Sequence, residues 1–172
     1  MSSLQSPARG WWGPFPKEEK LWLILAILGA VIMSVITVGW VYLAGQNVPA
    51  VSNKVTPEEF EKQVMAFQDK YKLQDGSVRV PPGEDAYLLA RMWSWSPVLR
   101  LKVGQTYNIW LSSKDVLHGF SFVDQNYNVM AAPGHAYRLR LTPQKAGEYL
   151  ILCNEYCGAG HGLMASKIIV EE

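Results

Sequence analysis

The stretch "AYRLRLTPQKAGEYLILC", Ala136 to Cys153, contains two short apolar runs joined by a segment that holds proline and glycine. Between Tyr137 and Leu141 the apolar residues alternate with two arginines, the pattern of a β-strand with one face in the core and one in water. The second run, "EYLILC", ends at a cysteine. Both runs predict strands.

Five more runs of this kind lie after Ser77, separated by Gly, Pro, Asn and Asp. They are "YLLARMWSW", "VLRLKVG", "TYNIWLSS", "GFSFV" and "SKIIVEE". Seven short strands in so small a region are typical of a β-sandwich or barrel. We therefore expect residues 77–172 to form one all-β domain.

The N-terminal part carries the segment "LWLILAILGAVIMSVITVGWVYLA", Leu21 to Ala44, without a charge or a proline. As a helix it would reach about 36 Å, enough to cross a hydrocarbon core of about 30 Å. A buried helix of a soluble core is rarely so long and so uniformly apolar, and a cleaved signal has an apolar region of about 7 to 15 residues. The sequence predicts one retained transmembrane helix.

Positive charges set the expected orientation of this helix. Arg9, Lys17 and Lys20 precede the apolar segment, whereas only Lys54 follows it closely. The positive-inside rule then places the N-terminus in the cytoplasm and the rest of the chain outside the membrane. The expected division is a cytoplasmic segment 1–20, a membrane helix 21–44, a linker 45–76 and an exported domain 77–172.

The linker contains signals for a second, amphipathic helix. Thr56, Pro57 and Glu59 fit an N-cap, a first helical position and a capping box. Four apolar residues then recur at helical spacing: Phe60, Val64, Phe67 and Tyr71. The sequence predicts a helix over about 57–72, whose stripe packs on the domain, on the membrane surface or on a partner subunit.

Charge is balanced over the whole chain, with 16 Lys+Arg against 15 Asp+Glu. From Gly45 onward the counts are 13 and 13. No basic patch points to nucleic acid, so we expect no nucleic-acid partner. Nor is there a net acidity that would attract a basic protein, and a docking surface that is more apolar than charged is the corresponding hypothesis.

The segment "CNEYCGAGHGLM", Cys153 to Met164, holds both cysteines of the chain. Outside the cell, two cysteines four residues apart first indicate a disulfide. A disulfide, however, needs neither the imidazole of His161 nor the thioether of Met164. Three alternating glycines allow this loop to turn tightly, because glycine tolerates positive φ, so several side chains can face one point.

Two further histidines are available to such a site. His118, in "DVLHGFSF", lies between two predicted strands, where an upstream metal ligand is placed in sandwich-type sites. His135, in "PGHAY", is interpreted as a surface residue in an exposed turn before a strand. His118 is therefore the second candidate imidazole.

The types of donor atom limit which metal ion the site can hold. Two thiolates and two imidazoles fit tetrahedral zinc, but a thioether favours copper. A mononuclear electron-transfer copper site would use Cys157, His161, Met164 and His118 as ligands. Such a site would leave Cys153 without a role. Two sulfurs that bridge two coppers would use every candidate.

These motifs resemble those of the subunit II family of haem-copper oxidases, in particular cytochrome c oxidase. The resemblance covers the membrane span and residues from about Tyr87 to Val170, and it implies a cupredoxin-like Greek-key sandwich or barrel with the binuclear copper centre called CuA. It also implies the following ligands for two copper ions: His118, Cys153, Cys157, His161, Met164 and the backbone carbonyl of Glu155.

The resemblance also suggests roles for residues that do not bind copper through their side chains. In the family, the carboxylate at the position of Glu155 often reaches a magnesium ion at the boundary with subunit I. The segment "MWSW" resembles the tryptophan-rich region where electrons arrive, so Trp93 or Trp95 is a candidate for that role, with a buried strand tryptophan as the equal alternative. The single expected helix resembles the compact B-type branch of the family.

The resemblance implies an electron-transfer subunit of an oxidase, with no catalysis by this chain alone. Electrons would come from cytochrome c or a small copper protein and pass to haem in subunit I, where oxygen is reduced and protons are pumped. The alternatives are the copper subunit of a haem-copper nitric oxide reductase, the related domain of nitrous oxide reductase, and a membrane-anchored copper carrier or assembly protein. The absence of a large catalytic domain disfavours nitrous oxide reductase.

Overall fold

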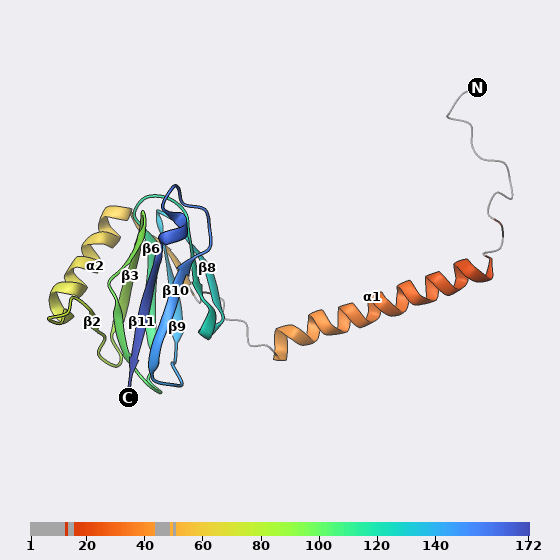
Figure 1. Cartoon of the computed structure of the whole chain (residues 1–172), viewed down its shortest axis with the longest axis horizontal. Helices are drawn as coiled ribbons and strands as arrows, with labels where there is room; N and C mark the ends of the chain where they lie inside the picture. Colours follow the sequence, from red (N-terminus) through yellow and green to blue (C-terminus); the bar gives the residue numbers. More distant parts are fainter. Residues whose placement is uncertain (1–12, 14–15, 44–48, 50) are drawn as a thin grey trace, which may run out of the picture. The chain divides into compact units, whose positions relative to one another are not determined.

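The computed structural model describes Gly13, residues 16–43, Pro49 and residues 51–172. The chain divides into two compact units, Met1–Gly45 and Gln46–Glu172, drawn in Figure 1. The prediction of a cytoplasmic segment over residues 1–20, with Arg9, falls largely outside the described residues.

The first unit contains one long helix, α1 (Lys17–Leu43). It begins four residues before the predicted span because the charged turn at Lys17–Lys20 is also helical, with Glu18 and Glu19 near the positive end of the helix dipole. Of the described residues, only this helix is long and apolar enough to cross a membrane, with a mean hydropathy of 2.7. None of its side chains is buried against protein, as is typical of a lipid-facing helix.

The second unit contains two mixed β-sheets. The first has the order β1 (Val51–Lys54), β9 (His135–Leu141), β6 (Tyr107–Ser113), β3 (Asp85–Arg91), β4 (Ser94–Ser96). The second has the order β2 (Val78–Arg79), β5 (Leu99–Lys102), β11 (Ala165–Glu171), β10 (Gly147–Cys153), β7 (His118–Phe122), β8 (Tyr127–Ala131). Strand pairs β3–β6, β5–β11 and β2–β5 are parallel and the others are antiparallel.

All seven predicted runs contain strands, so the predicted all-β domain is confirmed. The run "YLLARMWSW" is two strands, β3 and β4, because the chain turns at Met92 and Trp93. The strands β1, β2 and β8 were not predicted. β1 is polar and exposed, β2 has two residues, and β8 follows a short 3₁₀ helix, Val123–Gln125, that ends at the left-handed Asn126.

The core lies between the two sheets and follows the alternation seen in the sequence. In β9, Leu139 and Leu141 are buried while Arg140 is exposed. In β10, Ile151 faces the core while Leu150 and Leu152 face outward. Inward side chains of both sheets belong to one buried cluster, so the two layers share a single core.

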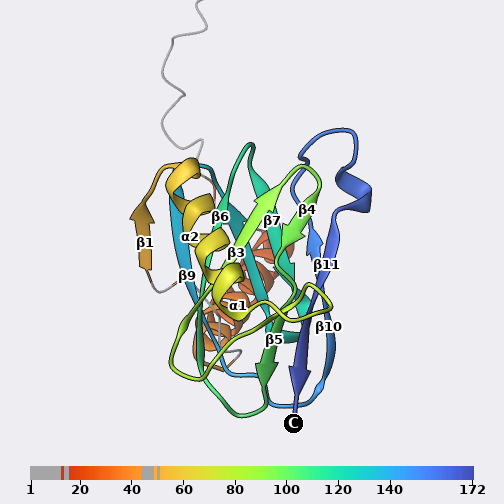
Figure 2. The ribbon, with the colours of Figure 1, turned by 90° about the vertical axis from the view of Figure 1, so that its left-hand side faces the viewer.

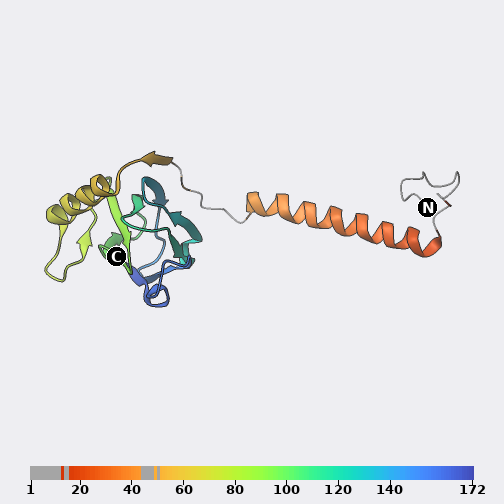
Figure 3. The ribbon, with the colours of Figure 1, turned by 90° about the horizontal axis from the view of Figure 1, so that it is seen from above.

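Helix α2 (Pro57–Tyr71) covers the outer face of the first sheet, as Figure 2 shows, and Figure 3 shows it lying outside the strands. The predicted capping box is present: Glu59 N–H donates to Thr56 Oγ1 at 3.2 Å, and Thr56 N–H donates to Glu59 Oε2 at 3.2 Å. Phe60 and Val64 are buried against Leu89 and neighbouring residues of the sheet. The apolar stripe therefore packs on the domain, at about 1.5–3 kcal/mol for each large side chain.

Three connections meet at one end of the sandwich. They are the β3–β4 turn, the β6–β7 loop before His118, and the β10–β11 loop over residues 154–164. Figures 1 and 2 show the last of these, in blue, at the end of the domain opposite the C-terminus. The candidate metal ligands lie in the β10–β11 loop and at the adjoining ends of β7 and β10.

Candidate metal centre

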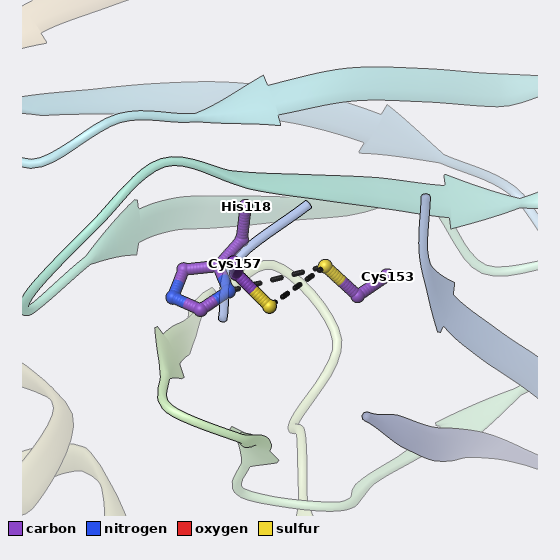
Figure 4. A group of neighbouring side chains, drawn as sticks. All are labelled: His118, Cys153 and Cys157. Carbon is purple, nitrogen blue, oxygen red and sulfur yellow. Dashed lines mark hydrogen bonds between the residues drawn. The ribbon is translucent and has the colours of Figure 1, made fainter. Parts of the chain in front are cut away.

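The centre is built on two adjacent strands. Cys153 is the last residue of β10 and His118 is the first of β7, and the two strands pair through Cys153 and Phe120. The Cys153 and Cys157 side chains are buried and His118 is fully buried. Figure 4 shows the two sulfur atoms turned toward each other, with the His118 ring beside them.

The cysteines are not joined by a disulfide. Their Sγ atoms are 3.7 Å apart, well beyond the S–S bond length of about 2.05 Å, and both thiols are free. Two sulfurs at this separation can still contact one metal ion at metal–sulfur bonds of about 2.3 Å. The pair is therefore placed to share metal ions.

Each sulfur has its own imidazole and its own weaker donor. Cys153 Sγ lies 3.9 Å from His118 Nδ1 and 3.2 Å from the Glu155 carbonyl oxygen. Cys157 Sγ lies 3.6 Å from His161 Nδ1 and 3.8 Å from the Met164 sulfur. The structure thus brings together all six residues that the sequence predicted as ligands.

Backbone hydrogen bonds hold the loop in this shape. Gly158 adopts φ 111°, which side-chain-bearing residues rarely adopt, and its carbonyl accepts from His161 N–H at 3.0 Å. A short 3₁₀ turn then carries His161 to Leu163. Cys153 N–H donates to Met164 O at 3.1 Å, so the first and last ligands of the loop are tied together.

Asp115 supports the centre and was missed by the sequence reasoning, although it begins the motif "DVLH". Its Oδ1 lies 2.8 Å from His118 Nε2, which leaves Nδ1 to face the sulfurs. Its carboxylate also accepts from the backbone N–H groups of Met92 and Val116 at 2.7 Å each. Burial raises the pKa of Asp115, but these hydrogen bonds outweigh burial and hold the pKa below its ordinary value. The group is therefore ionised at neutral pH.

The Cys157 thiol is protonated in the metal-free chain at neutral pH. Burial, with the hydrogen bond and the charge of Cys153, raises the pKa of Cys157 to about 11. Because a metal binds the thiolate, metal uptake at this site must release protons.

Comparison with known proteins identifies the family to which the chain belongs. A family model described as the periplasmic domain of cytochrome c oxidase subunit II matches residues 65–172, more than half of the chain. The chain belongs to the cytochrome c oxidase subunit II family. The resemblance that the sequence motifs indicated is thereby confirmed.

Individual relatives agree with this assignment. Two proteins of Thermus thermophilus named cytochrome c oxidase subunit 2 are each 38% identical over 87 residues, which is 50% of this chain. The chain spans 64% of the length of one and 52% of the length of the other. A chain in a cryo-EM structure of a haem-copper terminal oxidase dimer is 32% identical, with a TM-score of 0.62 over 90% of this chain and 100% of that chain.

The fold is also that of the family. The crystal structure of the periplasmic domain of subunit II of cytochrome oxidase from Bradyrhizobium japonicum superimposes with a TM-score of 0.50 over 54% of this chain and 87% of that chain. At 18% identity this likeness concerns the fold alone. The second unit is a cupredoxin-like sandwich of two mixed sheets, as predicted.

The two candidate tryptophans of this subunit II chain lie in different environments. Trp93 is 42% exposed at the β3–β4 turn, and its Nε1–H donates to the Cys157 carbonyl at 3.1 Å. Trp95 is buried in β4 with its ring edge-on to His118, at 6.1 Å between centroids, and to Phe120. Of these two tryptophans, Trp93 is the one that is both exposed to solvent and hydrogen-bonded to a candidate ligand residue.

His135 lies away from the centre. It is the first residue of β9, where it pairs with Lys54 of β1, and its ring stacks on Tyr137 at 6.4 Å. The predicted exposed turn is thus the beginning of a strand, and the side chain is partly buried.

The donors present fit copper. The set combines two thiols, two imidazoles and a buried thioether, and the thioether of Met164 favours copper over zinc. Asp115 fixes the ring of His118, as carboxylates do beside metal-bound histidines.

Proposed function

We propose that this chain is the electron-accepting subunit of a terminal respiratory oxidase, and that its exported domain holds two copper ions as a binuclear CuA centre. One observation carries the proposal. Two buried sulfurs lie 3.7 Å apart, and each has one imidazole and one weaker donor beside it. A single tetrahedral ion would use the two sulfurs and the two imidazoles, whereas the Glu155 carbonyl and the Met164 thioether add one further donor for each of two ions.

In this proposal the ligands divide into two groups. Cys153 and Cys157 would hold both copper ions, His118 and the Glu155 carbonyl would complete the ligands of one, and His161 and Met164 would complete those of the other. The copper pair, when bound, supplies a one-electron carrier. The chain buries the carrier, fixes its ligands and keeps water away, so that the site exchanges electrons and binds no substrate.

The proposed partners are a haem-containing subunit I, which would reduce oxygen and pump protons, and an electron donor of the cytochrome c or small copper protein class. The surface around the centre is apolar, with exposed side chains of Met92, Trp93, Leu117, Tyr156 and Leu163. Trp93, through its hydrogen bond to Cys157, is the proposed point of electron arrival; Trp95 is assigned to the core. A donor would then dock mainly by apolar contact, and its transfer rate would depend only weakly on ionic strength.

Glu155 supports a further proposal for the boundary with subunit I. Its carboxylate has no ion pair with any residue in the described part of the chain, while its carbonyl faces Cys153. We assign the carboxylate to a magnesium ion shared with subunit I.

We propose that α1 anchors the chain in the plasma membrane with its N-terminus in the cytoplasm and the copper domain outside. The proposed parts are a cytoplasmic segment 1–20, a membrane helix 21–44, a linker 45–76 and a copper domain 77–172. The linker includes α2, which is part of the folded domain surface rather than a free connection.

The test of the oxidase assignment uses the complex purified with subunit I. The proposal expects rapid oxygen consumption from a reduced donor, and a Cys153→Ser complex should lose it. A complex that consumes nitric oxide rapidly and oxygen hardly at all would instead be a nitric oxide reductase. A copper carrier is disfavoured because His118, a fully buried residue 35 positions before Cys153 in the sequence, closes the site.

A further inference from the structure

We infer that the Trp93 indole is a latch on the copper site: copper enters and leaves when the indole lifts from the ligand loop, and Gly160 is the position that lets the latch close. The inference rests on the proposed copper function. It concerns how the site opens, which is separate from how electrons reach it.

The indole lies directly on the segment that joins two ligands. Its Nε1–H donates to the Cys157 carbonyl at 3.1 Å. A methyl group built on Gly158 would meet the ring at 3.5 Å, and one built on Gly160 would meet it at 2.3–2.7 Å. The ring therefore presses on the backbone between Cys157 and His161.

Gly160 is glycine because of this ring. Its φ of −91° and ψ of 9° are open to other residues, so the backbone alone does not demand glycine. The clashing ring atoms are Cγ, Cδ2 and Cε3, near the base of the side chain, so the whole indole must move if a methyl group is added. Gly162, two residues on, has no atom within 4 Å of such a methyl group.

The other ligand side chains are buried. His118, Cys157 and Met164 are each less than 5% exposed, Cys153 is 9% exposed, and Trp95 and Phe120 belong to the same core cluster. His161 is the one side-chain ligand that is not buried, and it lies in the loop that Trp93 covers. This loop is therefore the most open approach to the site.

The latch can move without unfolding the domain. Trp93 is 42% exposed and sits on a short turn between β3 and β4. The backbone of that turn is anchored separately, by Met92 N–H donating to Asp115 at 2.7 Å. Rotation of the side chain into solvent breaks one hydrogen bond and one ring contact and leaves the strands in place.

The test compares Gly160→Ala with the matched control Gly162→Ala in the full chain in detergent. Two rates are measured: alkylation of the cysteines by iodoacetamide in the metal-free chain, and removal of copper by excess chelator from the loaded chain. Gly160→Ala should raise both rates about tenfold, equivalent to about 1.4 kcal/mol. Gly162→Ala should stay within about twofold of the native chain.

Two further variants show whether the effect passes through the ring. Trp93→Ala should match Gly160→Ala, and the double variant should be no faster than either single variant. Trp93→Phe, which keeps a ring but not the N–H donor, should be intermediate. Equal rates for the Gly160 and Gly162 variants, or additive effects in the double variant, would overturn the latch.

The alkylation rate needs no copper, so the two proposals fail separately. A chain that binds no copper pair but shows the Gly160 effect on alkylation contradicts the proposed function alone. A chain that binds the pair and shows no Gly160 effect contradicts the latch alone.

Discussion

Replacing Asp115 with Ala should weaken copper binding although Asp115 touches no metal. Its Oδ1 lies 2.8 Å from His118 Nε2, and this contact fixes the orientation of the fully buried His118 ring. Without it the ring is free to turn Nδ1 away from Cys153. Loss of such a supporting carboxylate costs about 10- to 100-fold in metal affinity. That range corresponds to about 1.4–2.8 kcal/mol, similar to the value of a hydrogen bond to a charged group.

The assay is competition for copper against a chelator of known affinity, with the full chain in detergent. Asp115→Asn keeps an acceptor for the ring and loses only the charge, so its affinity should fall by less than that of Asp115→Ala. Asp124→Ala, at an exposed carboxylate in the β7–β8 connection, is the matched control and should be unchanged. Thermal melting of the metal-free variants reports the separate cost of losing the contacts with Met92 and Val116. If Asp115→Ala bound copper as tightly as the control, the proposed support of His118 would be refuted.

Three other substitutions test the weak copper ligand, the packing of α2 and the ionisation of Asp75. Met164→Leu leaves both sulfurs and both imidazoles, so copper should stay bound at full stoichiometry while voltammetry shows a shifted reduction potential; loss of copper would contradict the weak-ligand assignment. Phe60→Ala removes a fully buried side chain under α2 and should lower the free energy of unfolding by about 3–5 kcal/mol in denaturant titrations, with the copper spectrum unchanged. Hydrogen bonds from Ser77 lower the pKa of Asp75 from 3.8 to about 2, so its stabilisation is present above pH 3.8 and is lost as pH falls through about 2. Asp75→Asn should therefore melt lower than the native chain at about pH 5 and close to it at about pH 2, and an equal gap at both pH values would exclude this contribution.

The ligands were predictable from the sequence because five of the six lie in one short loop. The segment that contains Cys153, Cys157, His161 and Met164 indicates a metal site, because thiol, imidazole and thioether groups seldom occur so close together in a sequence for another purpose. The strands were predictable where side chains alternate, as in β9, because one face of a strand must be buried. The capping box of α2 is equally local.

The supporting contacts were not predictable, because they depend on how distant segments pack. Asp115 meets His118 through the geometry of the β6–β7 loop. Trp93 reaches Gly160 across about seventy residues of sequence, and only the closed sandwich brings the β3–β4 turn to the ligand loop. The polar strand β1 carries no alternation, so only its pairing with β9 identifies it.

Electron paramagnetic resonance of the copper-loaded chain shows whether two copper ions share the two sulfurs. One unpaired electron spread equally over two copper nuclei of spin 3/2 gives seven hyperfine lines, whereas an electron on one copper gives four. We expect two coppers per chain with the seven-line pattern, and its loss in Cys153→Ser. One copper per chain with a four-line pattern in the native protein would show that the two sulfurs do not share a copper pair.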